Sequence, residues 1–224
     1  SALVKVRDLG ARPGHLVADG IPEPVAVAGG LIYDSDNLRD VYMVVDVGAG
    51  TTDFGVFVAT RKTIDDDFVM HQLSSSINGV MQAGDKVDDL LIAYIGTQEG
   101  INFDSPHGIE IKRNLSQTIR EQKEILFRDG RWKFALSDGT VGVVTKEALL
   151  TSPQMCRFAA LMQTTFADSL DRLNDSWLSF LSSPGMRLKV VVTGGGASLD
   201  MMQALATGVV DVRGFRIARE LVVS

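Results

Sequence analysis

Two acidic residues flank a short turn that is rich in glycine and threonine. Asp46 and Asp53 enclose the sequence Gly-Ala-Gly-Thr at 48–51, and apolar residues lie on both sides of the segment. Glycine amides can approach phosphate oxygens closely because no Cβ blocks them. A carboxylate at the end of a buried strand needs a partner, and a hydrated Mg²⁺ ion is a suitable one. The segment therefore indicates phosphate and magnesium chemistry, although a simple hairpin with a glycine-rich turn has the same pattern.

A second segment of this kind carries three consecutive glycines, Gly194, Gly195 and Gly196. They follow an apolar stretch at 188–192 and precede a helical pattern at 199–206. The amides at a helix N-terminus attract anions, and glycines let a ligand lie against the backbone. The spacing differs from the dinucleotide fingerprint and from the Walker loop. A ligand-binding loop is one interpretation, and an ordinary strand-to-helix loop is the other.

The elements that must position these segments follow from hydrophobic periodicity and from turn residues. The pattern predicts strands at 41–45, 54–59, 66–75, 132–136, 141–144 and 188–192, and helices at 83–94, 111–126, 152–181 and 199–206. Ser152 followed by Pro153 is typical of a helix start, and Pro184-Gly185 and Gly208 are expected to end the last two helices. Strands that alternate with helices indicate an α/β protein.

Composition excludes several classes of protein. The 224 residues include 22 Lys and Arg against 28 Asp and Glu, and the resulting net charge of −6 argues against a nucleic-acid partner. Every apolar stretch is too short or too interrupted to cross a membrane. The single cysteine, Cys156, cannot form an internal disulfide, and no Cys or His lies at metal-ligand spacing. We therefore expect a cytoplasmic location, and the missing initiator Met suggests a fragment of a longer protein.

Three segments in this order resemble the superfamily of actin, the sugar kinases and the heat-shock ATPases. Asp46 to Asp53 looks like its second phosphate motif, Glu23-Pro24 with the following alanines looks like its first connecting segment, and Thr193 to Leu199 looks like its adenosine motif. The order of the intervening helices and the hairpin is most similar to the heat-shock protein 70 ATPase domain. The resemblance implies a ribonuclease H-like (actin-like ATPase) lobe with an inserted smaller α/β subdomain, and ATP or ADP with Mg²⁺ as cofactors.

The resemblance also implies a role for each candidate residue. Glu23, Asp46, Thr51 and Asp53 would be catalytic: Glu23 would orient the attacking water, and the two aspartates would hold Mg²⁺ through waters. The amides at 48–50 (Gly48, Ala49, Gly50) and the Thr51 hydroxyl would contact the terminal phosphates. The nucleoside would lie against Lys123, Gly194, Gly195 and Gly196. Glu124 and Ser198 stand where the chaperones carry arginines beside the base, which implies weaker nucleotide binding.

The first-lobe phosphate loop of this superfamily, Asp-x-Gly-Thr, is missing from the place where it belongs. We therefore expect the second lobe of a heat-shock protein 70-like chaperone, with a core subdomain at 1–78 and 184–224 and an insertion at 79–183. Its partners would be the missing first lobe, a peptide-binding domain and co-chaperones, and the isolated chain would not hydrolyse ATP. Two alternatives stay open, namely a bacterial actin-like filament or cell-shape ATPase, which the spelling at 51–53 and 193–196 favours, and a non-catalytic scaffold with this fold.

Overall fold

The computed structural model describes residues 37–64, 66 and 68–222. The sequence-predicted segments before residue 37, including Glu23, lie outside this range. The described strands are β1 (Arg39–Val47), β2 (Thr52–Thr60), β3 (Val69–Gln72), β4 (Asn78–Val80), β5 (Arg131–Ala135), β6 (Val141–Thr145), β7 (Leu188–Thr193), β8 (Gly208–Val212) and β9 (Phe215–Leu221). The described helices are the 3₁₀ helix η2 (Ser74–Ser76) and the α-helices α3 (Gly84–Gln98), α4 (Pro106–Asp129), α5 (Lys146–Leu150), α6 (Pro153–Asp171), α7 (Asp175–Leu181) and α8 (Asp200–Leu205).

A mixed sheet forms the centre of this α/β protein. Its strand order is β3-β2-β1-β7-β9-β8, and β4 pairs with β2 beyond the end of β3. The pairs β1–β7 and β7–β9 are parallel, and the other pairs are antiparallel. Because β1 and β7 are parallel neighbours, their carboxyl ends, at Val47 and Thr193, meet at one edge of the sheet. This edge is where the sequence places both candidate loops.

The two faces of the sheet are packed differently. Val41, Met43, Val45 and Val47 point to the face covered by α6 and α8, and they belong to the main hydrophobic core with helix residues such as Phe166. Tyr42 and Val44 point to the other face and form a small second cluster with residues of β2 and β7. This alternation is the period of two expected for a strand, so the parity of a residue number in β1 states its face.

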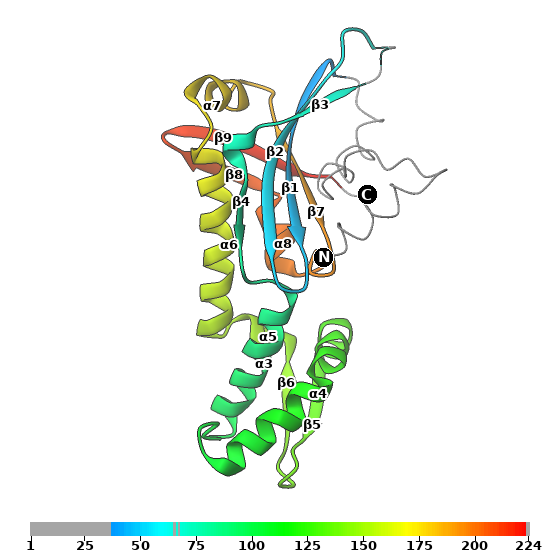
Figure 1. Ribbon diagram of the computed structural model, residues 1–224, viewed down its shortest axis with the longest axis vertical. Helices are drawn as coiled ribbons and strands as arrows, with labels where there is room; N and C mark the ends of the chain where they lie inside the picture. Colours follow the sequence, from blue (N-terminus) through cyan, green and yellow to red (C-terminus); the bar gives the residue numbers. More distant parts are fainter. Residues whose placement is uncertain (1–36, 65, 67, 223–224) are drawn as a thin grey trace, which may run out of the picture.

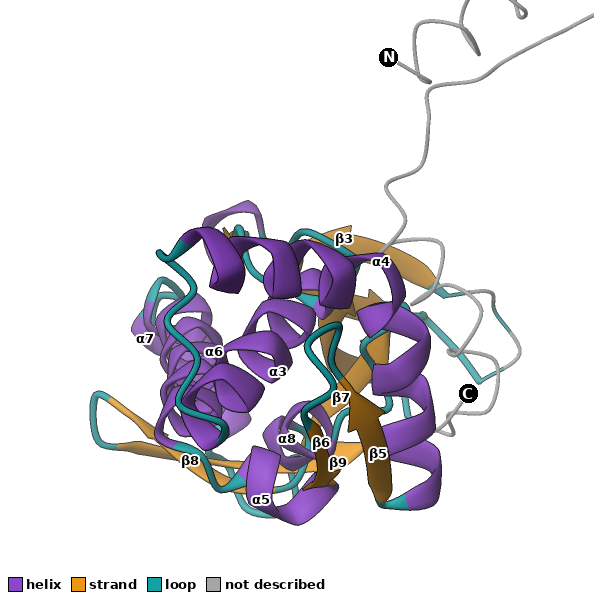
Figure 2. Ribbon diagram, turned by 90° about the horizontal axis from the view of Figure 1, so that it is seen from below, coloured by secondary structure: helices purple, strands orange, loops and turns teal. Residues whose placement is uncertain are grey.

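A smaller unit lies beyond the carboxyl edge of the sheet. It contains α3, α4, the β5–β6 hairpin and α5, and it forms the lower half of the molecule in Figure 1. Helix α4 packs against α3 and β5, and Figure 2 shows this group from below. Helix α6 packs against β2, β4, β8 and α8, so this part of the range 79–183 lies on the main sheet. The division at residues 78 and 184 stays a prediction.

Most sequence-predicted elements are confirmed, and the side-chain caps explain where helices begin. Ser152 accepts a hydrogen bond from Met155 N and caps α6, as the Ser-Pro signal predicts. The Asp138-Gly139 hairpin is present as β5 and β6, with Gly139 at a φ of 88°. The glycine-flanked helix expected at 83–94 is α3, and it continues to Gln98.

Three predictions are corrected. The helix expected at 152–181 is two helices, because Asn174 accepts a hydrogen bond from Trp177 N and starts α7. The strand expected at 66–75 is only β3, since the Ser76 hydroxyl on η2 takes the place of a backbone acceptor for Val56 N. Gly208 does not end α8, which stops at Leu205 with Ala206 as its C-cap; it begins β8, the first strand of an unpredicted hairpin with β9.

No described helix has both the length and the hydrophobicity of a membrane-spanning segment, and this includes α4 with its 24 residues.

At the amino-terminal ends of β1 and β7, a nearly buried ion pair joins Asp40 to Lys189 at 2.8 Å. Asn37 Nδ2 also donates to Asp40. Burial, and then the Asp40 carboxylate, raise the pKa of the Tyr42 phenol, so this hydroxyl stays neutral. The ion pair therefore links two central strands on a face that is largely closed to water.

We predict that Lys189→Met destabilises the protein by about 3 kcal/mol, because it leaves the buried Asp40 carboxylate without its cation. Urea unfolding monitored by circular dichroism measures this change. Lys112→Met removes an exposed lysine from α4 and serves as the control, with an expected change within about 0.5 kcal/mol. The double variant Asp40→Asn, Lys189→Met should recover part of the loss, and equal stability of the single and double variants would contradict this account.

Candidate functional site

The β1–β2 connection is a closed four-residue turn. The strands remain in register up to Val47 and Thr52, and Gly48 N donates to Thr51 O at 2.9 Å. The Gly48 amide is therefore used within the turn. Among the described residues, the amides of Ala49 and Gly50 donate to no protein acceptor. The Thr51 amide likewise donates to no described acceptor, so these three amides are donors that the turn can offer to a ligand.

The turn is fastened to the N-terminus of α3. Gly84 N donates to Gly48 O at 3.2 Å, and Asp85 N donates to Ala49 O at 2.8 Å. The first amides of a helix have no partner within the helix, and here the turn carbonyls satisfy two of them. The turn and α3 consequently form one rigid junction between the sheet and the smaller unit.

Asp46 and Asp53 lie directly opposite each other in the antiparallel pair of β1 and β2. Side chains in such a position have Cβ atoms about 5 Å apart, and like charges there repel. The Thr51 hydroxyl donates to Asp53 Oδ2 at 3.2 Å. Two neighbouring carboxylates are oxygen ligands of the kind that Mg²⁺ prefers, and the ion usually keeps several waters. The pair fits a hydrated Mg²⁺, and no group of three or more His, Cys, Asp or Glu side chains suited to a metal occurs in the described part of the chain.

Glycines lie against both carboxylates. A Cβ on Gly79 of β4 would lie 2.7 Å from Asp53 Oδ1, and a Cβ on Gly194 would lie 2.8 Å from Asp46 Oδ1 and 2.4 Å from Val47 O. Gly194 also has a φ of 86°, a conformation that favours glycine. Gly196 N donates to Val47 O at 3.1 Å. The loop 194–196 is therefore packed against the end of β1, whereas a Cβ on Gly195 would meet no atom within 4 Å.

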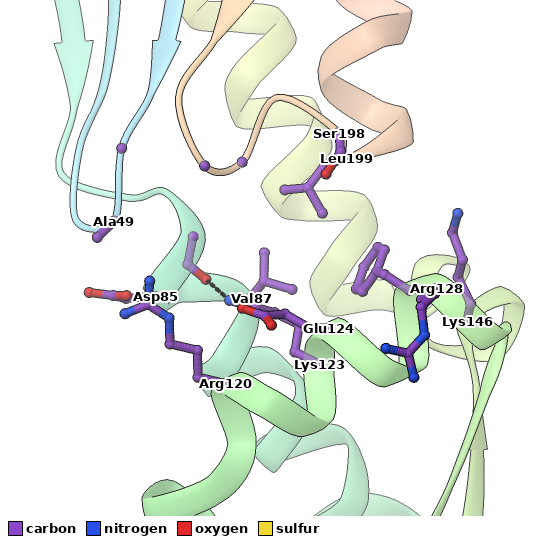
Figure 3. A pocket seen from close by; sticks show the side chains of 15 residues that line it. Ala49, Asp85, Val87, Arg120, Lys123, Glu124, Arg128, Lys146, Ser198 and Leu199 are labelled. Atoms are coloured by element: carbon purple, nitrogen blue, oxygen red, sulfur yellow. Dashed lines mark hydrogen bonds between the residues drawn. The ribbon is translucent and has the colours of Figure 1, made fainter.

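A cavity of about 580 Å³ lies between these loops and α4. Figure 3 shows it from close by. Its walls come from the β1–β2 turn, the first turns of α3, one face of α4, Lys146 and the β7–α8 loop. Arg120, Lys123, Glu124, Phe127 and Arg128 are spaced by three and four residues, so they share one face of α4. Its volume is in the range of small-molecule sites.

The structure sorts the sequence-predicted residues into two groups. The cavity is lined by Gly48, Ala49, Lys123, Gly195 and Gly196, whereas Asp46, Gly50, Thr51, Asp53 and Gly194 do not line it. Asp46 has the parity of Tyr42 and Val44, and it therefore lies on the sheet face opposite α6 and α8. The carboxylate pair and the cavity thus lie on different sides of the turn, and 48–51 is the segment between them.

Lys123 is largely occupied by protein contacts. Its Nζ lies 2.7 Å from Asp88 Oδ1 and donates to Gly84 O at 3.0 Å, and both side chains are about 15% exposed. Of the three donors of this ammonium group, one is used by the Gly84 carbonyl, and the Asp88 carboxylate neutralises its charge. Lys123 therefore joins α4 to α3 at the cavity wall. A search for i,i+4 partners along the sequence would not have found the pairing of Lys123 with Asp88, because the two residues lie on different helices.

The remaining polar residues of the cavity were not singled out by sequence reasoning. Arg120, Arg128, Lys146 and Asp85 line it together with the previously noted Glu124 and Ser198. The i, i+3, i+4 spacing of charged residues on α4 is the signal that could have found the first two. Lys146 pairs with Asp200 at 3.0 Å and lies over the Phe127 ring at 5.5 Å. Four cationic side chains and the carboxylates of Asp85 and Glu124 therefore line the same cavity, in a chain that is acidic overall.

The fold and the site together define an α/β protein with a cavity at the carboxyl edge of a mixed sheet, lined by both apolar and charged side chains. In comparisons with known proteins, neither a family model nor a curated protein matches the chain.

We predict opposite behaviour for two adjacent glycines. Gly194→Ala should lower the free energy of unfolding by more than about 2 kcal/mol, because the new Cβ meets Val47 O and the backbone has a positive φ. Gly195→Ala should change it by less than about 0.5 kcal/mol, since that Cβ enters open space. Thermal unfolding of both variants measures the difference. Equal destabilisation would show that the loop is packed in another way.

Proposed function

We propose that this chain is a nucleotide-binding lobe of the actin, sugar kinase and heat-shock ATPase superfamily, most similar to the second lobe of the heat-shock protein 70 ATPase domain. The observation that supports this best is the meeting of the β1–β2 turn and the 194–196 loop at one sheet edge, joined by the hydrogen bond from Gly196 N to Val47 O. The loops that resemble the phosphate and adenosine motifs are thereby brought to a single cavity. Ligands of open α/β sheets bind at such an edge, where neighbouring strands end.

The chemistry of the cavity and turn supports a nucleoside triphosphate such as ATP. The Ala49 and Gly50 amides are available to phosphate oxygens, Gly195 leaves room for a flat group against the backbone, and the cationic side chains of α4 favour an anion. The carboxylate pair on the other side of the turn would hold Mg²⁺ through waters, and the ion would neutralise phosphate charge. In this proposal the turn amides, the cations of α4 and the carboxylate pair would position the phosphates and the ion, and phosphoryl transfer depends mainly on such positioning.

Hydrolysis is proposed for the complete protein and not for this chain alone. Stabilisation of the transition state requires preorganised charge on both sides of the phosphates, and the turn supplies one side. The partner would be a first lobe, and Glu23 of this chain would orient the attacking water. We place such a protein in the cytoplasm. Exchange of the bound nucleotide would then rotate one lobe relative to the other, as in other proteins whose domains close around a ligand.

We predict that the chain binds Mg–ATP with a dissociation constant of about 1 mM, close to −4 kcal/mol, because one wall of the closed site is missing. Titration of the ¹⁵N-labelled chain by NMR should shift the amides of 48–51 and 194–196 first, and phosphate release should stay at background. Shifts confined to other parts of the chain would reject the proposed site. Turnover above background would show that the chain already contains a complete catalytic centre.

A second prediction concerns the carboxylate pair. Asp53→Asn should stabilise the magnesium-free chain by less than about 1 kcal/mol, because it removes the repulsion with Asp46. The same variant should lose the increase in melting temperature that MgCl₂ and ATP give the unmodified chain. Asp89→Asn changes an exposed aspartate of α3 and is the charge-matched control. A Mg²⁺ response that survives Asp53→Asn would remove this residue from the metal site.

A further inference from the structure

The four cations that line the cavity differ in their partners. Lys123 pairs with Asp88, Arg128 pairs with Asp129, and Lys146 pairs with Asp200. Arg120 has no hydrogen bond or ion pair with any residue in the part of the chain that the structure describes. A guanidinium group carries five N–H donors and stays charged at any physiological pH. Arg120 is therefore the cation of this cavity whose donors are available to a ligand.

The Arg120 side chain lies at one particular end of the cavity. In Figure 3 its side chain extends from α4 toward the end of the cavity where Ala49 and Asp85 lie, while Arg128 and Lys146 are at the opposite end. The Ala49 amide donates to no described protein acceptor, so unused donors from two different elements, the turn and α4, lie at the same end of the cavity. Asp85, which follows Gly84 in the first turn of α3, is the acidic group at this end.

From this arrangement, and on the basis of the proposed function, we propose that Arg120 binds the terminal phosphates of a nucleoside triphosphate. The guanidinium would donate two parallel hydrogen bonds to phosphate oxygens, the pairing that its planar fork favours. Arg120 would thereby provide a cation for the phosphates near the turn. Lys123 is less suited to this role, because it already contacts Asp88 and Gly84. Asp85 would oppose phosphate binding, because its carboxylate has the same charge as the ligand.

The proposal distinguishes ligands by their phosphate chain. The contact requires the β- or γ-phosphate, so its loss should affect a triphosphate strongly, a diphosphate less and a monophosphate hardly at all. It requires no base, so inorganic tripolyphosphate should respond as ATP does. Neither pattern is expected from a residue that only supports the fold of α4.

The test compares Arg120→Gln with Arg113→Gln in NMR titrations of the full chain. Arg113 is an exposed residue of the same helix that does not line the cavity. Each variant loses one arginine, so the two have the same net charge. We expect Arg120→Gln to weaken binding of Mg–ATP and of tripolyphosphate about tenfold and binding of AMP less than twofold. Arg113→Gln should leave all three within twofold, and Asp85→Asn should strengthen tripolyphosphate binding.

The outcomes distinguish a failure of the Arg120 proposal from a failure of the proposed function. Equal affinities of Arg120→Gln and Arg113→Gln for Mg–ATP would overturn the role of Arg120 and leave the proposed function intact. A uniform loss for ATP and AMP would also overturn it, because the contact would then not be made to the terminal phosphates. If the unmodified chain bound neither nucleotide nor tripolyphosphate, the proposed function itself would be rejected, and the role of Arg120 with it.

Discussion

The carboxyl end of β1 holds the site together through its backbone carbonyls. Val47 O accepts a hydrogen bond from Gly196 N, and Gly48 O and Ala49 O accept from the first amides of α3. One short stretch of chain thereby fixes the loop after β7 and the start of the smaller unit. Close approach at Gly194 is a consequence, because a side chain there would separate β7 from β1 at this edge. Without these contacts the cavity would have neither its sheet wall nor its helical wall.

Charge in the site is distributed according to burial. Where a cation is partly enclosed, as with Lys123, an acidic side chain lies within contact distance. This agrees with the high cost of an unpaired buried charge. The opposite arrangement, two acids side by side, occurs at Asp46 and Asp53, where Asp53 is exposed and water can screen it. Like charges thus lie where water can screen at least one of them, and the charge in the enclosed wall is paired.

Local signals in the sequence were sufficient for the parts of the fold that they encode. Continuous apolar runs predicted β1 and β2, and Ser152 with Pro153 predicted the start of α6. The break at Asn174 was missed because the spacing of apolar residues continues through both helices. The pairing of Lys123 with Asp88 depends on how α3 and α4 pack, and no spacing within either helix contains that information. The sequence could have predicted that Asp46 lies away from the cavity, because alternate residues of a strand share a face and Asp46 therefore lies with Tyr42 and Val44.

The junction between the turn and α3 has a mechanical consequence. Helix α3 has 15 residues, so it is about 22 Å long, and a tilt of about 5° at its first turn would move its far end by about 2 Å. Near that end, Gln98 Nε2 donates to Val143 O of the β5–β6 hairpin. Helix α3 thus connects the turn at its first residues to the hairpin at its last residues. A small displacement of Gly48 and Ala49 would be amplified at a surface far from the sheet.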